Sequence, residues 1–327
     1  MAESQPNTTG SFSYQSAAVP RGELSSGLCY LARDKSGSDE PPVGLDPVEV
    51  SVEVINGRAA GLESLTLDSA GFMLTPHCYA HIDYMNEDAI VGPYYAEVCD
   101  LVRRTTGASK VVAFDHNIRA SETKSWMNQD GQEVSGQSIA GGNKVQSPAM
   151  VVHNDYTKTS APLRLDLLSQ PPKANDTWAK TSTDNAPLID PLALAALKSK
   201  RYQFINVWRS IADEPVTDMP LALCHGATVS REDLVTFEIR YADRVGENYF
   251  AGHSPRHRWF FFPQMTRDEA VLLKVWDSAG ALCSPEGAGE GGGVATFSLH
   301  SAFRDPAAPP DGPKRRSIEV RTVAFFD

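Results

Sequence analysis

The 327-residue chain lacks the long apolar runs and the cysteine spacings that mark several classes of protein. No stretch approaches the roughly 20 apolar residues of a membrane-spanning helix, and the polar N-terminus has no signal-peptide core. The five cysteines are an odd number, scattered and without Cys-x-x-Cys spacing, which disfavours a disulfide framework or a zinc site. These absences predict an intracellular, cytoplasmic protein.

Positive charge is also scarce. The 30 Lys and Arg residues are outnumbered by 41 Asp and Glu, which gives a net charge of −11 and a pI near 5.2. This balance argues against an electrostatic surface for nucleic acid or anionic membranes, and the one basic cluster, at 314–316, is too short to change that. The expected partner is a small-molecule substrate, and a homodimer or heterodimer is left open.

Helical patterns are few, whereas 22 prolines and 24 glycines punctuate many short alternating segments. The last third is almost continuously strand-like, at 234–240, 257–262, 270–276, 295–300 and 317–326. The lack of strand–helix alternation there disfavours a doubly wound α/β sheet. The predicted fold is mainly β with flanking helices, a jelly-roll barrel of the cupin-like kind.

The chain divides into a leader and one domain. Residues 1–20 are polar and are expected to be a disordered leader. The single domain, 21–327, comprises an N-terminal elaboration over about 21–108 and a jelly-roll core over about 109–327. A helix is expected at 87–106 in the elaboration, and polar intervals are expected to form mobile loops at 121–146, 169–190 and 287–293.

Two segments far apart in sequence carry residues that suit a metal. His153 and Asp155 form a His-x-Asp step, and His300 lies on a distant strand-like segment. Because side chains alternate along a strand, His153 and Asp155 share one face, which a second histidine can complete. Two imidazoles and a carboxylate with open positions suit a non-haem Fe(II) oxygenase. Oxidative chemistry is the leading hypothesis.

A His-x-Asp step is weak evidence alone, because His81-Ile82-Asp83 is a second instance. His77 and His81 also have the i, i+4 spacing that can bind a metal on a helix. Pro76 and the β-like surroundings disfavour that helix. His153 instead follows a short strand-like run and precedes a loop, as expected of a ligand at a barrel mouth, so the later pair is preferred.

The strand after His300 offers an anchor for an acid. Arg315, Ser317, Glu319 and Arg321 project from one face of it. A guanidinium with a hydroxyl two residues on can grip a carboxylate through a fork and one further hydrogen bond. Such an anchor suits the far carboxylate of 2-oxoglutarate, and Arg321 is the rival to Arg315 on the same face.

A set of ordered blocks resembles the fungal hydroxylase/desaturase family of secondary metabolism, which includes gibberellin desaturase-like and meroterpenoid-tailoring Fe(II)/2-oxoglutarate-dependent enzymes. The resemblance covers about 90–327. It implies a double-stranded β-helix, iron ligands at His153, Asp155 and His300, and the use of Fe(II), 2-oxoglutarate and O₂. The blocks are Phe114-Asp115-His116-Asn117-Ile118-Arg119, Val152-His153-Asn154-Asp155-Tyr156-Thr157, Asn206-Val207-Trp208-Arg209, His257-Arg258-Trp259-Phe260-Phe261, Val275-Trp276-Asp277-Ser278, His300-Ser301-Ala302-Phe303 with Asp305, and Arg315-Arg316-Ser317-Ile318-Glu319-Val320-Arg321.

The same blocks supply candidate pocket residues. Asp115, His116 and Arg119 belong to the first block, and Trp208 and Arg209 to the third. Each has an alternative as a buried packing or hydrogen-bonding residue. No separate acid or base is assigned, because the chemistry is expected at the iron.

The expected function is an Fe(II)/2-oxoglutarate-dependent dioxygenase that hydroxylates, desaturates or otherwise oxidises a natural-product intermediate. One alternative is a non-catalytic jelly-roll partner subunit of a related oxygenase, which the intact His153, Asp155, His300 and Arg315 disfavour. Another is an iron oxygenase that uses no 2-oxo acid, which Arg315 and Ser317 disfavour. The substrate cannot be carried over from the family, because the loops have no transferable pattern.

Overall fold

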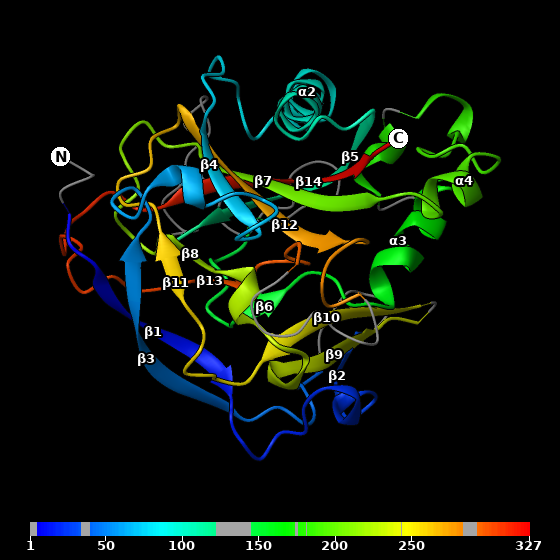
Figure 1. The fold of residues 1–327 in the computed structure, drawn as a ribbon. Coiled ribbons are helices and arrows are strands. Elements are labelled where there is room, and N and C mark those ends of the chain that lie inside the picture. The colour runs from blue at the N-terminus through cyan, green and yellow to red at the C-terminus, as the bar shows by residue number, and fades with distance from the viewer. Residues whose placement is uncertain are drawn as a thin grey trace.

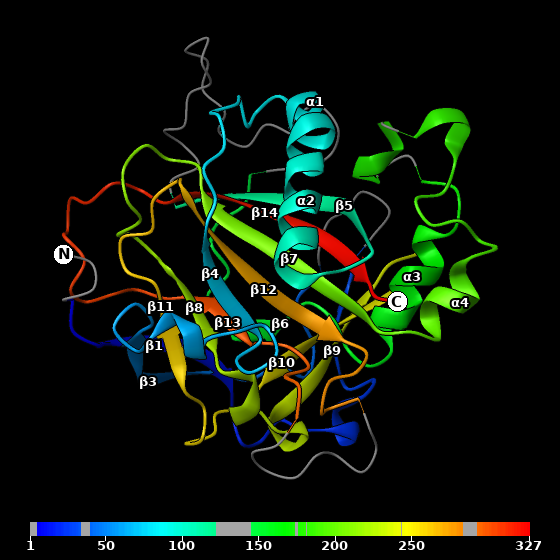
Figure 2. The same cartoon turned by 45° about the horizontal axis from the view of Figure 1, so that its top comes forward.

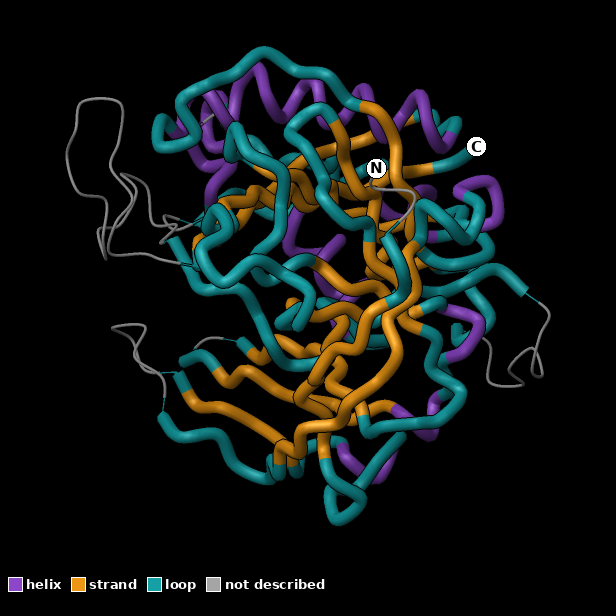
Figure 3. Tube along the Cα trace, turned by 90° about the vertical axis from the view of Figure 1, so that its left-hand side faces the viewer, coloured by secondary structure: helices purple, strands orange, loops and turns teal. Residues whose placement is uncertain are grey.

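The computed structural model describes residues 5–33, 40–121, 145–173, 176–180, 182–242, 244–283 and 293–327. Two β-sheets face each other, with helices on the outside (Figure 1). Figure 3 shows the strands gathered in the centre and the helices mostly around them. Most of the predicted loops at 121–146 and 287–293 lies outside the described residues.

The smaller sheet has five antiparallel strands. Helix α2 (Tyr95–Thr106) packs on its outer face and ends at Gly107, whose φ of 73° allows a left-handed cap. Figure 2 shows α2 lying across the sheet, preceded by α1 (Glu87–Ala89) and a π turn (Ile90–Tyr94). The helix predicted at 87–106 is therefore confirmed. In order, the strands are β4 (Phe72–Pro76), β12 (Glu269–Asp277), β7 (Tyr202–Ser210), β14 (Arg316–Phe325) and β5 (Lys110–Ala120).

The larger sheet has nine strands, and the main hydrophobic core lies between the two sheets. Helices α3 (Ser160–Leu168) and α4 (Leu194–Lys198) lie at one end (Figure 1). The prediction of a mainly β fold with flanking helices is confirmed. In order, the strands are β1 (Thr8–Gln15), β3 (Pro47–Asn56), β11 (Trp259–Phe261), β8 (Leu221–Cys224), β13 (His300–Ala302), β6 (His153–Asn154), β10 (Val245–Ala251), β9 (Leu234–Arg240) and β2 (Cys29–Ala32). Short 3₁₀ turns lie at Glu23–Ser25, Leu62–Ser64, Thr177–Lys180, Thr183–Asn185, Gly226–Thr228 and Arg231–Asp233.

The prediction of a disordered leader over 1–20 is wrong for β1. This strand pairs with β3 along its whole length at the edge of the larger sheet. Phe12 and Tyr14 are fully buried, and the Phe12 ring stacks on Trp259 at 4.5 Å between centroids. The polar composition concealed a two-residue alternation, in which serines take the outer positions of an edge strand while the aromatic rings enter the core.

The hydroxyl of Tyr14 fastens β1 to the core, and removing it is expected to destabilise the protein. It accepts a 2.8 Å hydrogen bond from Trp259 Nε1 and lies 3.1 Å from His257 Nδ1. Tyr14→Phe would leave the buried indole N–H unpaired, so the free energy of unfolding should fall by about 1–3 kcal/mol. Urea denaturation measures this loss. Tyr30→Phe, at a half-buried ring on β2, is the control, and equal stabilities of the two variants would contradict the assignment.

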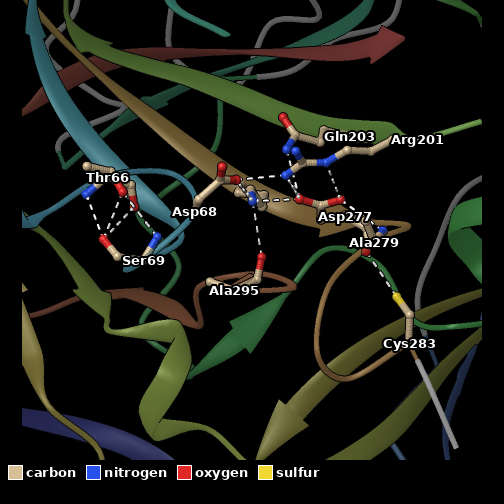
Figure 4. A network of polar contacts seen from close by, with 10 residues as sticks. Thr66, Asp68, Ser69, Arg201, Gln203, Asp277, Ala279, Cys283 and Ala295 are labelled. Carbon is tan, nitrogen blue, oxygen red and sulfur yellow. Dashed lines mark hydrogen bonds and ion pairs between the residues drawn. The ribbon is translucent and has the colours of Figure 1, made fainter. Parts of the chain in front are cut away.

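A buried polar cluster holds the segment that leads to β13 (Figure 4). Lys274 and Asp277, both fully buried on β12, form a 2.7 Å ion pair, and Arg201 and Gln203 also donate to Asp277. Burial opposes ionisation of Asp277, but its contacts with Arg201 and Lys274 outweigh burial and lower its pKa below the usual value. Lys274 Nζ donates to the Ala295 carbonyl at 3.1 Å, and its backbone carbonyl accepts from the Ser298 amide at 3.0 Å. The cluster thereby fixes the approach to His300.

Candidate metal centre and adjoining cavities

The structure brings His153, Asp155 and His300 together. Strands β6 and β13 are antiparallel neighbours in which His153 stands directly opposite His300, with 4.3 Å between the ring centroids. His153 Nε2 lies 3.9 Å from Asp155 Oδ1, and ligand atoms of the three residues all lie within 4.8 Å of one another. Among the described residues this is the only such group of three or more His, Cys, Asp or Glu, and it does not include His77, His81 or Asp83.

Each imidazole is oriented by the backbone of its own strand. His153 Nδ1 lies 2.8 Å from the Val151 carbonyl, and His300 Nδ1 lies 3.2 Å from the Ser298 carbonyl. Donation from Nδ1–H to a carbonyl leaves Nε2 as the lone-pair atom, the arrangement found in metal-ligating histidines. Burial lowers the pKa of His153 to about 4 and also lowers the pKa of His300. Both rings are therefore neutral at pH 7, the form that binds a metal.

The two carboxylate oxygens of Asp155 have different surroundings. Oδ2 accepts hydrogen bonds from Asn206 Nδ2 at 2.8 Å and from Arg321 Nε at 3.4 Å. Oδ1 faces His153. Burial would raise the pKa of Asp155, but the Arg321 charge and the neighbouring histidines outweigh it and hold the pKa well below its usual range. An ionised oxygen is thus directed toward the two imidazoles.

Opposite the strands that carry the candidate metal ligands, the inner face of the smaller sheet carries a polar surface. It consists of cross-strand rows over β7, β14 and β5, whose residues are aligned by the pairing register. A bulge at Phe114 lies at the end of this surface, since Arg321 pairs with Asp115 and the next residue, Thr322, pairs with Ala113. The rows are Ser210–Ser317–Arg119, Trp208–Glu319–Asn117 and Asn206–Arg321–Asp115.

Arg315 is a buried cation beside the three candidate ligands. Its side chain donates to Ser317 Oγ at 3.1 Å and to the Met219 carbonyl at 2.6 Å, and its guanidinium lies 5.0 Å from the centre of the Trp208 ring. No described residue forms an ion pair with the Arg315 guanidinium. The buried Trp208 Nε1–H likewise has no hydrogen-bond acceptor among the described residues. Burial and the Arg119 charge lower the pKa of Arg315 to about 9. The site therefore fits a carboxylate, which would compensate the guanidinium and accept from the indole.

One cavity, here called the anchor cavity, is lined by Arg315, Ser317 and the three candidate ligands. Arg321 makes different contacts from Arg315. Its Nη1 donates to Asp115 Oδ2 at 2.8 Å, and its Nε faces Asp155. The expectation that Arg321 binds 2-oxoglutarate is therefore not supported by its contacts.

The remaining pocket candidates lie on two faces of the smaller sheet. Arg119 and Trp208 line the anchor cavity. His116 and Arg209 project from the other face, where His116 Nδ1 lies 2.8 Å from Tyr95 Oη and Arg209 Nη1 lies 3.2 Å from His77 Nδ1. Neither residue lines the anchor cavity, because adjacent residues on a strand point to opposite faces.

A second cavity, here called the wide cavity, lies on the other side of Asp155. Its volume is about 350 Å³, within the range of small-molecule sites. Asp155 and Arg321 form part of its wall, together with the fifth candidate, Asp115. Its other walls come from α3, the β9–β10 hairpin, the bulge on β5, the segment after β6 and the start of the 3₁₀ turn Thr177–Lys180. They include Phe114, Tyr156, Leu163, Arg164, Thr177 and Tyr241. Asp155 thus lines both cavities.

Sequence analysis missed Asn206, although Asn206 donates to the candidate ligand Asp155. It occurs in the block Asn206-Val207-Trp208-Arg209, and its two-residue spacing from Trp208 places both on one strand face. That spacing was the available signal. Its pairing with Arg321 depends on a β7–β14 register between segments more than a hundred residues apart.

The chain is similar to a family model and to several named fungal proteins. A family model described as "Oxidoreductase/YMDC permease-like domain" matches residues 20–325. The protein named hydroxylase/desaturase efuI, from Hormonema carpetanum, is 26% identical over 92% of this chain and 90% of its own length. The Fe(II)/2-oxoglutarate-dependent dioxygenase nvfI, from Aspergillus novofumigatus, is 29% identical over 80% of this chain and 79% of its own. The resemblance inferred from the ordered blocks is confirmed.

The fold also matches a solved structure. The iron and alpha-ketoglutarate-dependent endoperoxidase NvfI superposes with a TM-score of 0.71 at 22% identity, and the match covers 99% of each chain. This likeness supports the jelly-roll class. No helix in the described ranges is long and apolar enough to cross a membrane.

Proposed function

The chain belongs to the oxidoreductase/YMDC permease-like domain family, and from that premise we propose that it is an Fe(II)/2-oxoglutarate-dependent oxygenase acting on a small-molecule natural-product intermediate. The observation that carries the proposal is the clustering of His153, Asp155 and His300 within 4.8 Å beside Arg315. The first three residues are a donor set that suits Fe(II), and the fourth is a buried cation that suits an acid.

Nε2 of His153, Nε2 of His300 and Oδ1 of Asp155 would hold the metal. When bound, Fe(II) with 2-oxoglutarate and O₂ supplies the oxidising chemistry for an unactivated C–H bond. The protein contributes neutral, pre-oriented imidazoles and a carboxylate that is ionised before the metal arrives. Binding therefore requires little rearrangement of these side chains.

Arg315 and Ser317 would bind the distal carboxylate of 2-oxoglutarate. The Arg315 side chain is only 3% exposed, so its interaction with an anion is weakly screened by water. Contacts with Ser317 and the Met219 carbonyl fix the guanidinium before binding, and Trp208 Nε1 offers a further donor. This wall of the anchor cavity thus orients the cosubstrate toward the metal ligands.

The wide cavity is the candidate for the substrate, because it is of small-molecule size and shares Asp155 with the anchor cavity, although neither candidate imidazole lines it. Its walls mix apolar residues such as Phe114 and Leu163 with Arg164 and Tyr156. Such a lining suits a largely apolar compound with a few polar groups. Hydroxylation and desaturation are both compatible with it, since the outcome depends on which C–H bond is presented.

The test is succinate formation after anaerobic loading with Fe(II), followed by 2-oxoglutarate and air. Uncoupled conversion of 2-oxoglutarate to succinate is the expected result and needs no knowledge of the substrate. Protein loaded with redox-inert Zn(II) is the matched control. A protein that neither binds Fe(II) nor forms succinate would instead be the non-catalytic partner subunit. Oxygen uptake that does not require 2-oxoglutarate would indicate an iron oxygenase of another kind.

A further inference from the structure

A row of side chains contacts the Asp155 carboxylate on the side away from the two candidate imidazoles. These side chains do not themselves reach the imidazoles. We propose that Arg321, with Asn206 beside it and Asp115 behind it, is a positioning residue that determines which Asp155 oxygen faces the metal. The inference rests on the proposed function only for the identity of that metal. It predicts that Arg321 controls metal affinity and leaves cosubstrate affinity unchanged.

The need for such a residue follows from the symmetry of a carboxylate. The terminal torsion of Asp is broad, so without fixed donors the two oxygens exchange places easily. Here Oδ2 accepts from Asn206 Nδ2 at 2.8 Å and from Arg321 Nε at 3.4 Å, whereas Oδ1 lies 3.9 Å from His153 Nε2. The two donors engage one oxygen and leave the other directed at the imidazoles.

Arg321 is itself fixed by a second carboxylate. Its Nη1 donates to Asp115 Oδ2 at 2.8 Å, and Asp115 Oδ1 accepts from Thr177 Oγ1 at 3.0 Å. The pairing register aligns Asn206, Arg321 and Asp115 directly across three strands. A guanidinium can meet Asp155 and Asp115 at the same time through different nitrogens of one rigid plane, which a lysine ammonium cannot reproduce.

Charge balance supports the same role. Arg321 lies between the ionised groups of Asp115 and Asp155, and its Nη2 is 3.9 Å from Glu319 Oε1. One cation therefore compensates the negative charge of several carboxylates within a largely buried site. Arg321→Lys keeps the positive charge but lacks the planar set of guanidinium donors. It therefore measures the orienting contribution of Arg321 separately from the effect of losing a buried charge.

The experiment compares Arg321→Lys with Arg209→Lys, using Mn(II) as a redox-stable probe in calorimetric titrations. Arg209 is also buried, and it projects from the opposite face of the same sheet, where it contacts His77. Arg321→Lys should weaken Mn(II) binding about tenfold or more, because residues that orient metal ligands typically contribute 10–100-fold to affinity. The affinity of the metal-saturated variant for 2-oxoglutarate should stay within about twofold of wild type. Arg209→Lys should change the melting temperature without changing Mn(II) affinity.

Wild-type Mn(II) affinity in Arg321→Lys would overturn the inference. If that variant does not fold, Asp115→Asn replaces it: this change keeps the shape and an acceptor but removes the charge that fixes Arg321. A several-fold loss of Mn(II) affinity is expected there, and no loss overturns the inference. Arg321-dependent Mn(II) binding without succinate formation would overturn the proposed function alone. Succinate formation with unchanged Mn(II) affinity in the variant would overturn this inference alone.

Discussion

Replacing His300 with Ala is expected to abolish stoichiometric metal binding and succinate formation while the fold is retained. The side chain is 4% exposed, and its Nδ1 interacts with the carbonyl of Ser298, two residues earlier on the same segment. Its removal therefore deletes a candidate ligand without breaking a hydrogen bond to another element. With a single imidazole and Asp155 left, the site loses the three-point geometry that holds Fe(II).

Metal content by elemental analysis and thermal unfolding by circular dichroism measure the two parts of this prediction. His225→Ala is the matched control, because His225 is half-buried beside Phe260 and lies outside both cavities. It should retain full metal content. A His300→Ala protein that still binds one metal and turns over would show that the ligand set is misassigned.

The three candidate ligands could be found from sequence because the information was local. A His-x-Asp step specifies a shared strand face without knowledge of the fold, and the face of β14 with Arg315, Ser317 and Arg321 follows from the same period of two. The same rule would have excluded His116 and Arg209. These two were named because they occur in the same blocks as Asp115 and Trp208, although their positions on the strands place them on the other face.

Other features depend on pairings that no local pattern encodes. Arg321 meets Asn206 and Asp115 only through the registers of β14 with β7 and β5, and the bulge at Phe114 follows directly after this row. Strand β1 was missed for a related reason. Its serines suggested disorder, whereas burial of Phe12 and Tyr14 against Trp259 and His257 stabilises the strand. Such contacts between distant segments were not available to reasoning from composition.

Arg315→Ala is expected to weaken 2-oxoglutarate binding by about one to two orders of magnitude with little change in metal affinity. A hydrogen bond to a charged group contributes about 1.5–3 kcal/mol, and each 1.4 kcal/mol corresponds to tenfold. Calorimetric titration of the Mn(II)-loaded protein measures the effect. Ser317→Ala, which removes only the neutral hydroxyl, should give a smaller loss.

The role of the distal carboxylate can be isolated with 2-oxobutyrate, a 2-oxo acid without that group. If Arg315 recognises only the far end of the cosubstrate, wild type and Arg315→Ala should bind 2-oxobutyrate with similar, weak affinity, whereas 2-oxoglutarate discriminates between them. Equal losses for both acids would mean that Arg315 acts on the metal-binding end or on the fold. Unchanged 2-oxoglutarate binding in Arg315→Ala together with a loss in Arg321→Ala would transfer the anchor to Arg321. That result would also contradict the positioning role of Arg321, because the same guanidinium cannot hold Asp155 and Asp115 as observed and also bind the distal carboxylate.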